Sequence, residues 1–148
     1  MQSLDRYIEL RKKVFLKDVS IGFTRMYLFA KDELINAQAM KRNLKDNWYV
    51  IGYEDLCSDI IVIDASDESF PVYIAAYDEN SWDLDLIAAS FLNFIEALQL
   101  IKNISVGREN PIKLKENPIP REEKMVLLND IYSINGIENS FWVDLLEY

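Results

Sequence analysis

The spacing of apolar and polar residues predicts three elements in the first 45 positions of the chain. Apolar residues at helical spacing, interrupted by the basic run 11–13, predict a short helix over residues 4–15. Residues 19–29 place β-branched and aromatic side chains at odd positions, and this two-residue period predicts one half-buried strand. Residues 32–42 return to helical spacing and predict a second helix.

The middle of the chain predicts an antiparallel sheet followed by a long helix. Three short apolar runs, rich in Val, Ile and Tyr, are separated by polar turns. They occupy residues 48–51, 60–63 and 72–76. Runs of this length and composition favour strands, and the short connections favour antiparallel neighbours. Residues 83–101 then carry apolar side chains on a broad helical stripe, with Ser81 or Asp83 available to cap the start of the helix.

The last third of the chain predicts helices that follow an irregular connection. Residues 102–120 are polar and hold three of the four prolines. Pro120 fits the first position of a helix that Gly136 would stop, and residues 138–147 predict one more short helix. The complete pattern predicts an α+β fold: an antiparallel meander sheet of about four or more strands, backed by helices, with a C-terminal helical appendage.

A chain of 148 residues has the usual size of one domain, and we expect a single domain over residues 1–148. Its core is expected at about residues 19–102 and a helical extension at about residues 118–148. Charged residues stand near the start of the chain where a signal peptide is apolar, and no later stretch approaches 18 uncharged apolar residues. We therefore expect a cytoplasmic protein.

The formal charge of −9 is distributed unevenly. Residues 1–45 carry ten Lys/Arg and five Asp/Glu, residues 102–148 carry six and eight, and residues 46–101 carry twelve Asp/Glu with no Lys or Arg. Because phosphate binding depends on basic side chains, this acidic stretch predicts neither a nucleic-acid nor a membrane partner. A basic protein is the better electrostatic match, and the alternative is a solvated surface that maintains solubility.

The residue inventory removes most catalytic mechanisms. The chain has no histidine and a single cysteine, Cys57, which excludes Ser-His and Cys-His nucleophiles and the usual zinc sites. Its four glycines lack the spacing of a phosphate-binding loop. We expect no enzyme, no cofactor and no metal. Two alternatives stay open: a hydrolase that uses a pair of carboxylates, and a calcium site in the acidic turn at residues 64–69.

Several short segments, in this order and at this spacing, resemble the SUKH superfamily, which includes bacterial immunity proteins and a fungal cell-wall-assembly regulator. They are Val50-Ile51-Gly52, the strand ending at Asp64, Pro71-Val72-Tyr73, Ile87-Ala88-Ala89-Ser90-Phe91 and Phe94-Ile95. The resemblance covers roughly residues 20–102. It implies a non-catalytic immunity protein that binds and neutralises a toxin, in many cases a basic nuclease. The alternative on the same fold is a regulatory adaptor that binds a host protein or peptide.

The candidate partner-binding residues lie in the loops of the acidic stretch. They are Glu54, Asp55, Asp59, Asp67, Glu68, Asp78, Glu79, Trp82 and Asp83. The carboxylates would steer a basic toxin, and Trp82 would serve as an aromatic anchor that acids surround. The structural alternative for Trp82 is a side chain that packs the start of the predicted helix onto the sheet. For Asp83 it is a favourable charge at the N-terminus of that helix.

Overall fold

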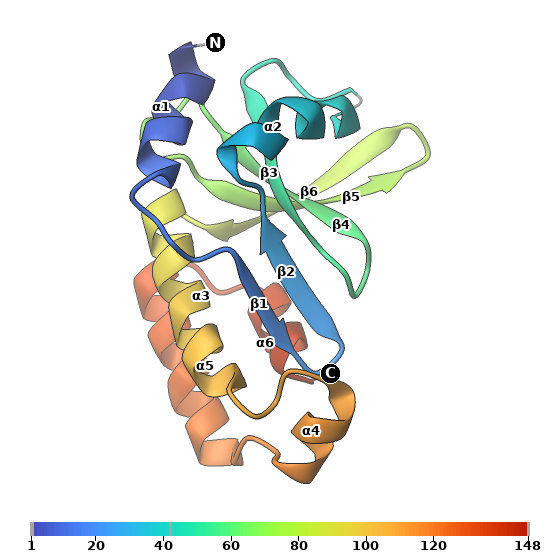
Figure 1. Ribbon diagram of the computed structural model, residues 1–148, viewed down its shortest axis with the longest axis vertical. Coiled ribbons are helices and arrows are strands. Elements are labelled where there is room, and N and C mark those ends of the chain that lie inside the picture. The colour runs from blue at the N-terminus through green and yellow to red at the C-terminus, as the bar shows by residue number, and fades with distance from the viewer. Residues whose placement is uncertain (1, 42, 148) are drawn as a thin grey trace.

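A computed structural model describes residues 2–41 and 43–147, and its centre is one antiparallel sheet in which each strand pairs with the next (Figure 1). The strands are β1 (Asp18–Ile21), β2 (Thr24–Leu28), β3 (Trp48–Glu54), β4 (Asp59–Asp64), β5 (Val72–Asp78) and β6 (Ser81–Ala88). The helices are α1 (Gln2–Arg11), α2 (Lys31–Ala37), the 3₁₀ helix η1 (Gln38–Met40), α3 (Phe91–Ser105), α4 (Pro111–Glu116), α5 (Arg121–Asn135) and α6 (Ser140–Glu147). The predicted α+β meander is confirmed, with six strands.

The segment predicted as one strand over residues 19–29 is a hairpin. β1 and β2 pair around a tight turn at Gly22 and Phe23, and Gly22 has a φ of 55°, a left-handed conformation that suits glycine. The turn reverses the alternation, so the odd-numbered residues of β1 and the even-numbered residues of β2 are buried. Phe23, expected inside, is exposed.

The first two helices end earlier than predicted. α1 ends at Arg11, and the helix predicted over residues 32–42 narrows into η1 after Ala37. η1 places Gln38 against β3. The contact falls on a part of β3 that does not pair with β2, because the β2–β3 ladder includes only residues Gly52 to Glu54 of β3. The Gln38 side chain accepts a hydrogen bond from the Val50 N–H (2.9 Å) and donates one to the Val50 carbonyl (2.8 Å). One amide thus satisfies two backbone groups at the edge of the ladder.

The helix predicted over residues 83–101 is wrong in its first part. Residues 81–88 form β6, and the helix begins at Phe91 after Ser90, whose hydroxyl accepts a hydrogen bond from the Asn93 N–H (3.1 Å). Ser90 is therefore the N-cap, in place of Ser81 or Asp83. The exposure of residues 81–86 alternates between exposed and half-buried, which is the two-residue period of a strand.

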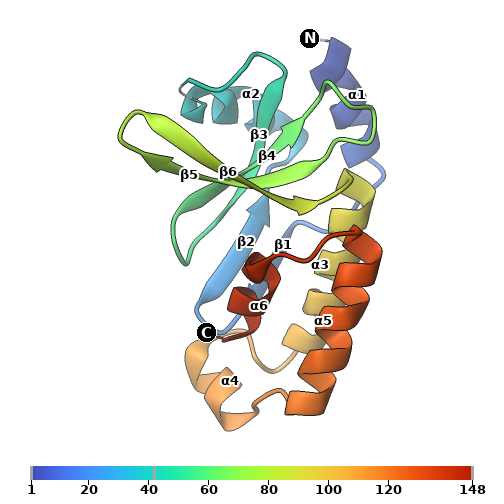
Figure 2. The ribbon, with the colours of Figure 1, turned by 180° about the vertical axis from the view of Figure 1, so that it is seen from behind.

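The C-terminal third is more helical than predicted. α3 runs to Ser105, and α4 occupies part of the segment expected to be irregular. α5 begins directly after Pro120 and ends at Asn135. The next residue, Gly136, has a φ of 72° and donates its N–H to the Tyr132 carbonyl. α6 confirms the last predicted helix. α3 packs on β1 and β6, α5 packs on α3, and α6 contacts α5 (Figure 2).

One cluster of buried residues joins the sheet to these helices. Tyr7 of α1 is fully buried, with its ring edge-on to Phe70 and Phe91, and Trp142 of α6 is fully buried beside Phe94. None of the helices in the described residues is long and apolar enough to cross a membrane.

Candidate functional site

The sheet divides the predicted binding residues between its two ends. Successive antiparallel strands reverse direction, so the β3–β4 and β5–β6 turns lie at one end of the β4–β5 ladder and the β4–β5 loop lies at the other. The first end carries Glu54, Asp55, Asp59, Asp78 and Glu79. Asp67 and Glu68 belong to the second end, so the structure does not bring all the predicted residues together.

Four carboxylates share one face of β4, β5 and β6. Residues directly opposite each other in an antiparallel ladder point to the same side, and Asp83 stands opposite Ala76 while Asp85 stands opposite Ile74. Ile74 is also opposite Ile61 of β4, which places Asp59 on this side. Asp78, four residues after Ile74 in β5, points to the same side because side chains in a strand alternate with a two-residue period. The acids on this side of the sheet are Asp59, Asp78, Asp83 and Asp85.

Glu54 and Asp144 extend this group, because helix α6 lies against the same side of the sheet. A cavity of about 160 Å³ between the sheet and α6 is lined by Glu54, Asp59, Asp85 and Asp144. Ile74, Phe141 and Leu145 supply apolar parts of its wall. We call the six carboxylates the acidic face: Glu54, Asp59, Asp78, Asp83, Asp85 and Asp144. Asp85 and Asp144 are additions to the predicted set.

Glu54 organises the β3–β4 turn beside this cavity. Only 4% of its surface is exposed, and its two carboxylate oxygens accept hydrogen bonds from the backbone N–H groups of Leu56 (2.9 Å) and Cys57 (2.8 Å). The turn also contains Ser58 in a left-handed conformation (φ 60°). Glu54 therefore holds the turn in shape, while the more accessible acids around it face solvent.

The nearby carboxylates change the acidity of their neighbours. Partial burial, followed by the charge of Glu54, raises the pKa of Asp59. Burial and then the charges of Glu54 and Asp59 raise the pKa of the Cys57 thiol, although this residue is exposed to solvent. A thiol needs a lowered pKa to act as a nucleophile at neutral pH, so this environment does not activate Cys57.

Ligand atoms of Glu54, Cys57 and Asp59 lie within 4.8 Å of one another, which is close enough to surround a cation. Both oxygens of Glu54 accept backbone hydrogen bonds, and burial, followed by the charges of Glu54 and Asp59, raises the pKa of the Cys57 thiol and so opposes its deprotonation. Metal binding through a thiol requires its deprotonation. The arrangement therefore favours a turn-stabilising role for Glu54 over metal coordination.

The acids of the β4–β5 loop bind their own backbone. Asp64 accepts hydrogen bonds from the Ser66 N–H (3.0 Å) and hydroxyl (2.6 Å), and Asp67 accepts the same pair from Ser69 (2.9 and 2.7 Å). The bonds from Ser69 lower the pKa of Asp67. This is the turn geometry expected of aspartate, in which one oxygen of each carboxylate stabilises the turn, and it favours a structural role for both residues over the calcium alternative. A carboxylate oxygen of Glu68 lies 3.7 Å from a guanidinium nitrogen of Arg6 in α1.

Trp82 lies on the opposite side of the sheet from Asp83. It stands directly across from Tyr77, with ring centroids 4.8 Å apart, and shares a cavity of about 390 Å³ with Trp48, Leu44 and Leu84. The alternative in which Trp82 packs a helix start is wrong, because it lies within β6. The alternation of residues 81–86 is the signal that separates Trp82 from its acidic neighbours.

Few ion pairs involve the acids of residues 46–101. In the described residues, five ion pairs lie within 4.0 Å, and only Arg6–Glu68 involves an acid from residues 46–101. The acidic face therefore has no basic side chain of the described chain within ion-pair distance. No ion pair within the described residues offsets the repulsion between these like charges. The acidic face therefore favours a cationic partner.

Comparisons with known proteins give no relative. No protein-family model, no curated protein and no solved structure matches the chain.

Proposed function

We propose that this chain is a non-catalytic protein-binding domain whose acidic face captures a basic protein. The observation that carries the proposal is the gathering of six carboxylates from β3, β4, β5, β6 and α6 on one side of the molecule, without a basic partner in the described residues. A face of one sign accelerates association with an oppositely charged partner and discriminates against like-charged ones.

The partner class follows from the resemblance to the SUKH superfamily. We propose a cytoplasmic immunity protein that neutralises a toxin, and a nuclease toxin fits because its substrate-binding surface is basic. An acidic face that covers such a surface would block the substrate without any chemistry in the inhibitor. Charge would set the rate and specificity of the encounter, and apolar contacts would supply much of the affinity.

The test uses toxin genes adjacent to the gene for this chain, each co-expressed with it in a growth assay. The expected result is that one toxin arrests growth alone and not in the presence of this chain. The affinity of the purified complex should fall steeply between low salt and about 0.5 M NaCl. At the higher salt concentration the Debye length is only a few ångströms, about 4 Å, so most of the attraction between the two charged surfaces is screened. Binding of a host protein without protection against any toxin would support the regulatory-adaptor alternative.

A set of variants tests the face itself. Changing Asp59, Asp78, Asp83 and Asp85 to Asn removes four charges and keeps side-chain size, and it leaves Glu54 in place to hold the turn. We expect the association rate to fall by at least about tenfold and the salt dependence to flatten.

A face variant that loses two charges, Asp83→Asn with Asp85→Asn, is compared with a matched control that changes Asp67 and Glu68 to Asn and Gln. Asp67 and Glu68 belong to the same stretch of sequence and lie at the other end of the sheet. We expect the control to keep the association rate of the unaltered protein. An equal loss in both variants would mean that net charge, and not the acidic face, governs binding.

A further inference from the structure

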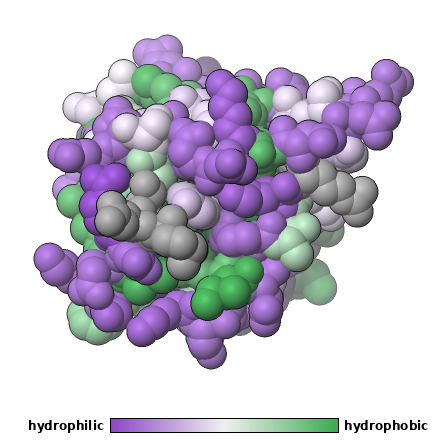
Figure 3. Space-filling view, turned by 90° about the horizontal axis from the view of Figure 1, so that it is seen from above, coloured by the Kyte–Doolittle hydropathy of each residue, from purple (hydrophilic) through white to green (hydrophobic). Residues whose placement is uncertain are grey.

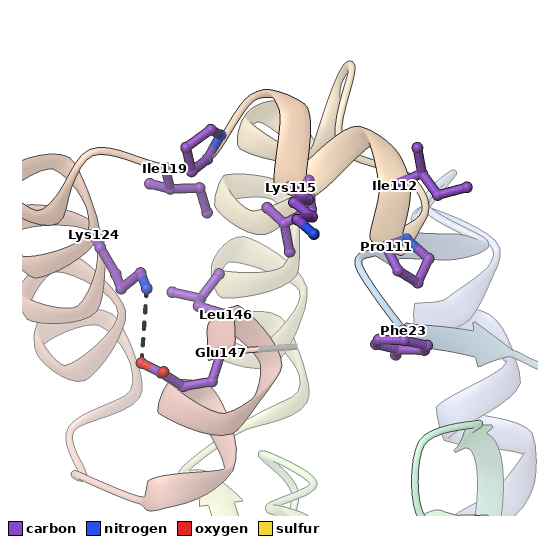
Figure 4. Close-up of a pocket in the computed structure, with 10 residues that line it drawn as sticks. Phe23, Pro111, Ile112, Lys115, Ile119, Lys124, Leu146 and Glu147 are labelled. Carbon is purple, nitrogen blue, oxygen red and sulfur yellow. Dashed lines mark ion pairs between the residues drawn. The ribbon is translucent and has the colours of Figure 1, made fainter.

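A third cavity, of about 550 Å³ (Figure 4), opens at the end of the molecule that carries α4 and the β1–β2 turn (Figure 1). Its lining comes from segments far apart in the sequence: Phe23 in the turn, residues of α4 and the segment after it, Lys124 of α5, and the end of α6. None of the acidic-face residues lines it. Its volume falls in the range of small-molecule binding sites.

The walls of this cavity are anchored by Arg108, which precedes α4. Its guanidinium donates hydrogen bonds to the Ile104 carbonyl at the end of α3 (2.9 Å) and to the Asn117 carbonyl just after α4 (2.6 Å). Its own carbonyl accepts the N–H of Gly22 in the β1–β2 turn (2.9 Å). One residue therefore fixes both ends of the α4 segment and the turn that carries Phe23. A cavity with fixed walls binds a ligand with a smaller entropic cost.

Two of the apolar side chains that line this cavity, Phe23 and Ile112, are exposed, whereas Leu146 and Ile119 are buried. Phe23 is 64% exposed and Ile112 71% exposed, and Figure 4 shows Phe23 beneath Pro111 on one wall, with Leu146 and Ile119 farther along. The end of the molecule seen in Figure 3 is by contrast mainly hydrophilic. Scattered exposed apolar residues are ordinary, whereas a group of them around a cavity marks a binding site.

The charges at the cavity favour an anion. Lys115 and Lys124 line it together with one acid, Glu147. The Glu147 carboxylate lies 3.7 Å from the Lys124 ammonium nitrogen. In the described part of the chain, Lys115 makes no ion pair and no hydrogen bond. The cavity thus holds a net positive charge in a chain of net charge −9. An apolar wall with an unpaired ammonium complements a ligand that has an apolar tail and one acidic group.

We propose that this cavity binds a free medium-chain carboxylate, with its tail against Phe23 and Ile112 and its carboxylate at Lys115. A free ligand fits a concave site of this volume, whereas an embedded lipid would have to leave its bilayer to enter it. The proposal is independent of the protein-binding function, because the two sites share no residue.

The test is calorimetric titration of the full chain with decanoate below its micelle concentration, alongside decanol and decylamine. We expect decanoate to bind at least about fivefold more tightly than decanol, and decylamine to bind most weakly. Lys115→Gln should lower decanoate affinity about fivefold and leave decanol unchanged. Glu147→Gln should raise decanoate affinity about threefold, because it removes a like charge and frees Lys124.

Two matched controls accompany these variants. Lys113→Gln removes a charge from the same helix at a position that does not line the cavity, and it should leave decanoate binding unchanged. Phe23→Ser should lower the affinity for decanoate and decanol alike by about tenfold, whereas Ile35→Ser, at a 73% exposed position on α2, should not.

Three results would overturn the proposal: equal binding of decanol and decanoate, an equal effect of the Lys113 and Lys115 substitutions, or binding only to vesicles that contain anionic phospholipid. The first would indicate a purely apolar site, the second a general effect of net charge, and the third a membrane surface.

Discussion

The indole N–H of Trp142 donates a hydrogen bond of 2.9 Å to the backbone carbonyl of Ile87, 55 positions earlier in the chain. Ile87 lies near the end of β6, an edge strand of the sheet, where none of the described residues forms a further strand that could pair with its carbonyl. The last helix thus completes the hydrogen bonding of the last strand. Because Trp142 is fully buried, the bond is shielded from water.

Trp142→Phe should therefore lower the free energy of unfolding by about 1–3 kcal/mol, since it leaves the Ile87 carbonyl without its donor and removes part of a packed ring. Urea denaturation followed by far-UV circular dichroism measures the change. Leu92→Ala, at a position that is 55% exposed on α3, serves as the control and should change the free energy by less than about 0.5 kcal/mol.

Tyr7→Phe should have the opposite effect and raise the free energy of unfolding. The Tyr7 hydroxyl is completely buried and has no hydrogen-bond partner in the described residues, and burial raises the pKa of its phenol well above the usual range. Removing an unsatisfied buried hydroxyl, while keeping the ring contacts with Phe70 and Phe91, should stabilise the fold by about 1 kcal/mol. A loss of stability in the same denaturation experiment would show that the hydroxyl is bonded in solution.

Asp59→Asn should stabilise the protein at neutral pH. The pKa of Asp59 is raised by burial and by Glu54, so the folded state holds the Asp59 proton more tightly than the unfolded state does. Its ionisation opposes folding. This penalty is absent below the unfolded pKa of about 3.9, grows as pH rises from the unfolded to the folded pKa, and is complete above the folded pKa. The stability gain of the variant should thus appear near pH 7 and vanish near about pH 3.

Asp67→Asn is the matched variant with the reverse pH profile. Hydrogen bonds from Ser69 lower the pKa of Asp67, so its contribution to stability is present above the unfolded pKa of about 3.9 and is lost as pH falls through the folded pKa. We expect this variant to be less stable than the unaltered protein at pH 7 and equal to it under strongly acidic conditions. Parallel pH profiles for the two variants would contradict both assignments.

Ser90→Ala tests where the long helix begins. Loss of the hydroxyl that accepts the Asn93 N–H should lower the free energy of unfolding by about 1 kcal/mol. Ser81→Ala changes an exposed position in β6 that the sequence also offers as a cap, and it should have an effect below about 0.5 kcal/mol. If the Ser81 variant lost more stability than the Ser90 variant, the helix would begin before β6 ends.

The sheet was predictable where the apolar runs are short and bounded by polar turns. β3, β4 and β5 contain the three predicted strands, each extended by one or more residues. The prediction failed for β6 because Leu84, Ile87, Phe91 and Phe94 also fit a helical stripe, and the turn at Glu79 and Asn80 contains no glycine or proline. Both turn residues adopt left-handed conformations (φ 44° and 74°), which asparagine tolerates more readily than most residues.

The acidic face was only partly predictable. Charge counting identifies the acidic stretch, and the β6 error hid the alternation that separates Asp83 and Asp85 from Trp82. Asp144 could not be predicted from the sequence. It lies 90 positions after Glu54 and comes near that residue only because α6 folds back against the sheet. The lysine-containing cavity was missed for the same reason: Phe23, Lys115 and Leu146 carry no shared sequence signal.

The contact between Gln38 and Val50 has a consequence for self-association. Where a ladder stops short, the unpaired N–H and C=O groups of the longer strand form a template on which a second chain can add a strand. The Gln38 amide fills that template with a side chain from the same molecule, so β3 offers no free position there for edge-to-edge growth. We therefore expect the Gln38 side chain to oppose the addition of a second chain at this position of β3.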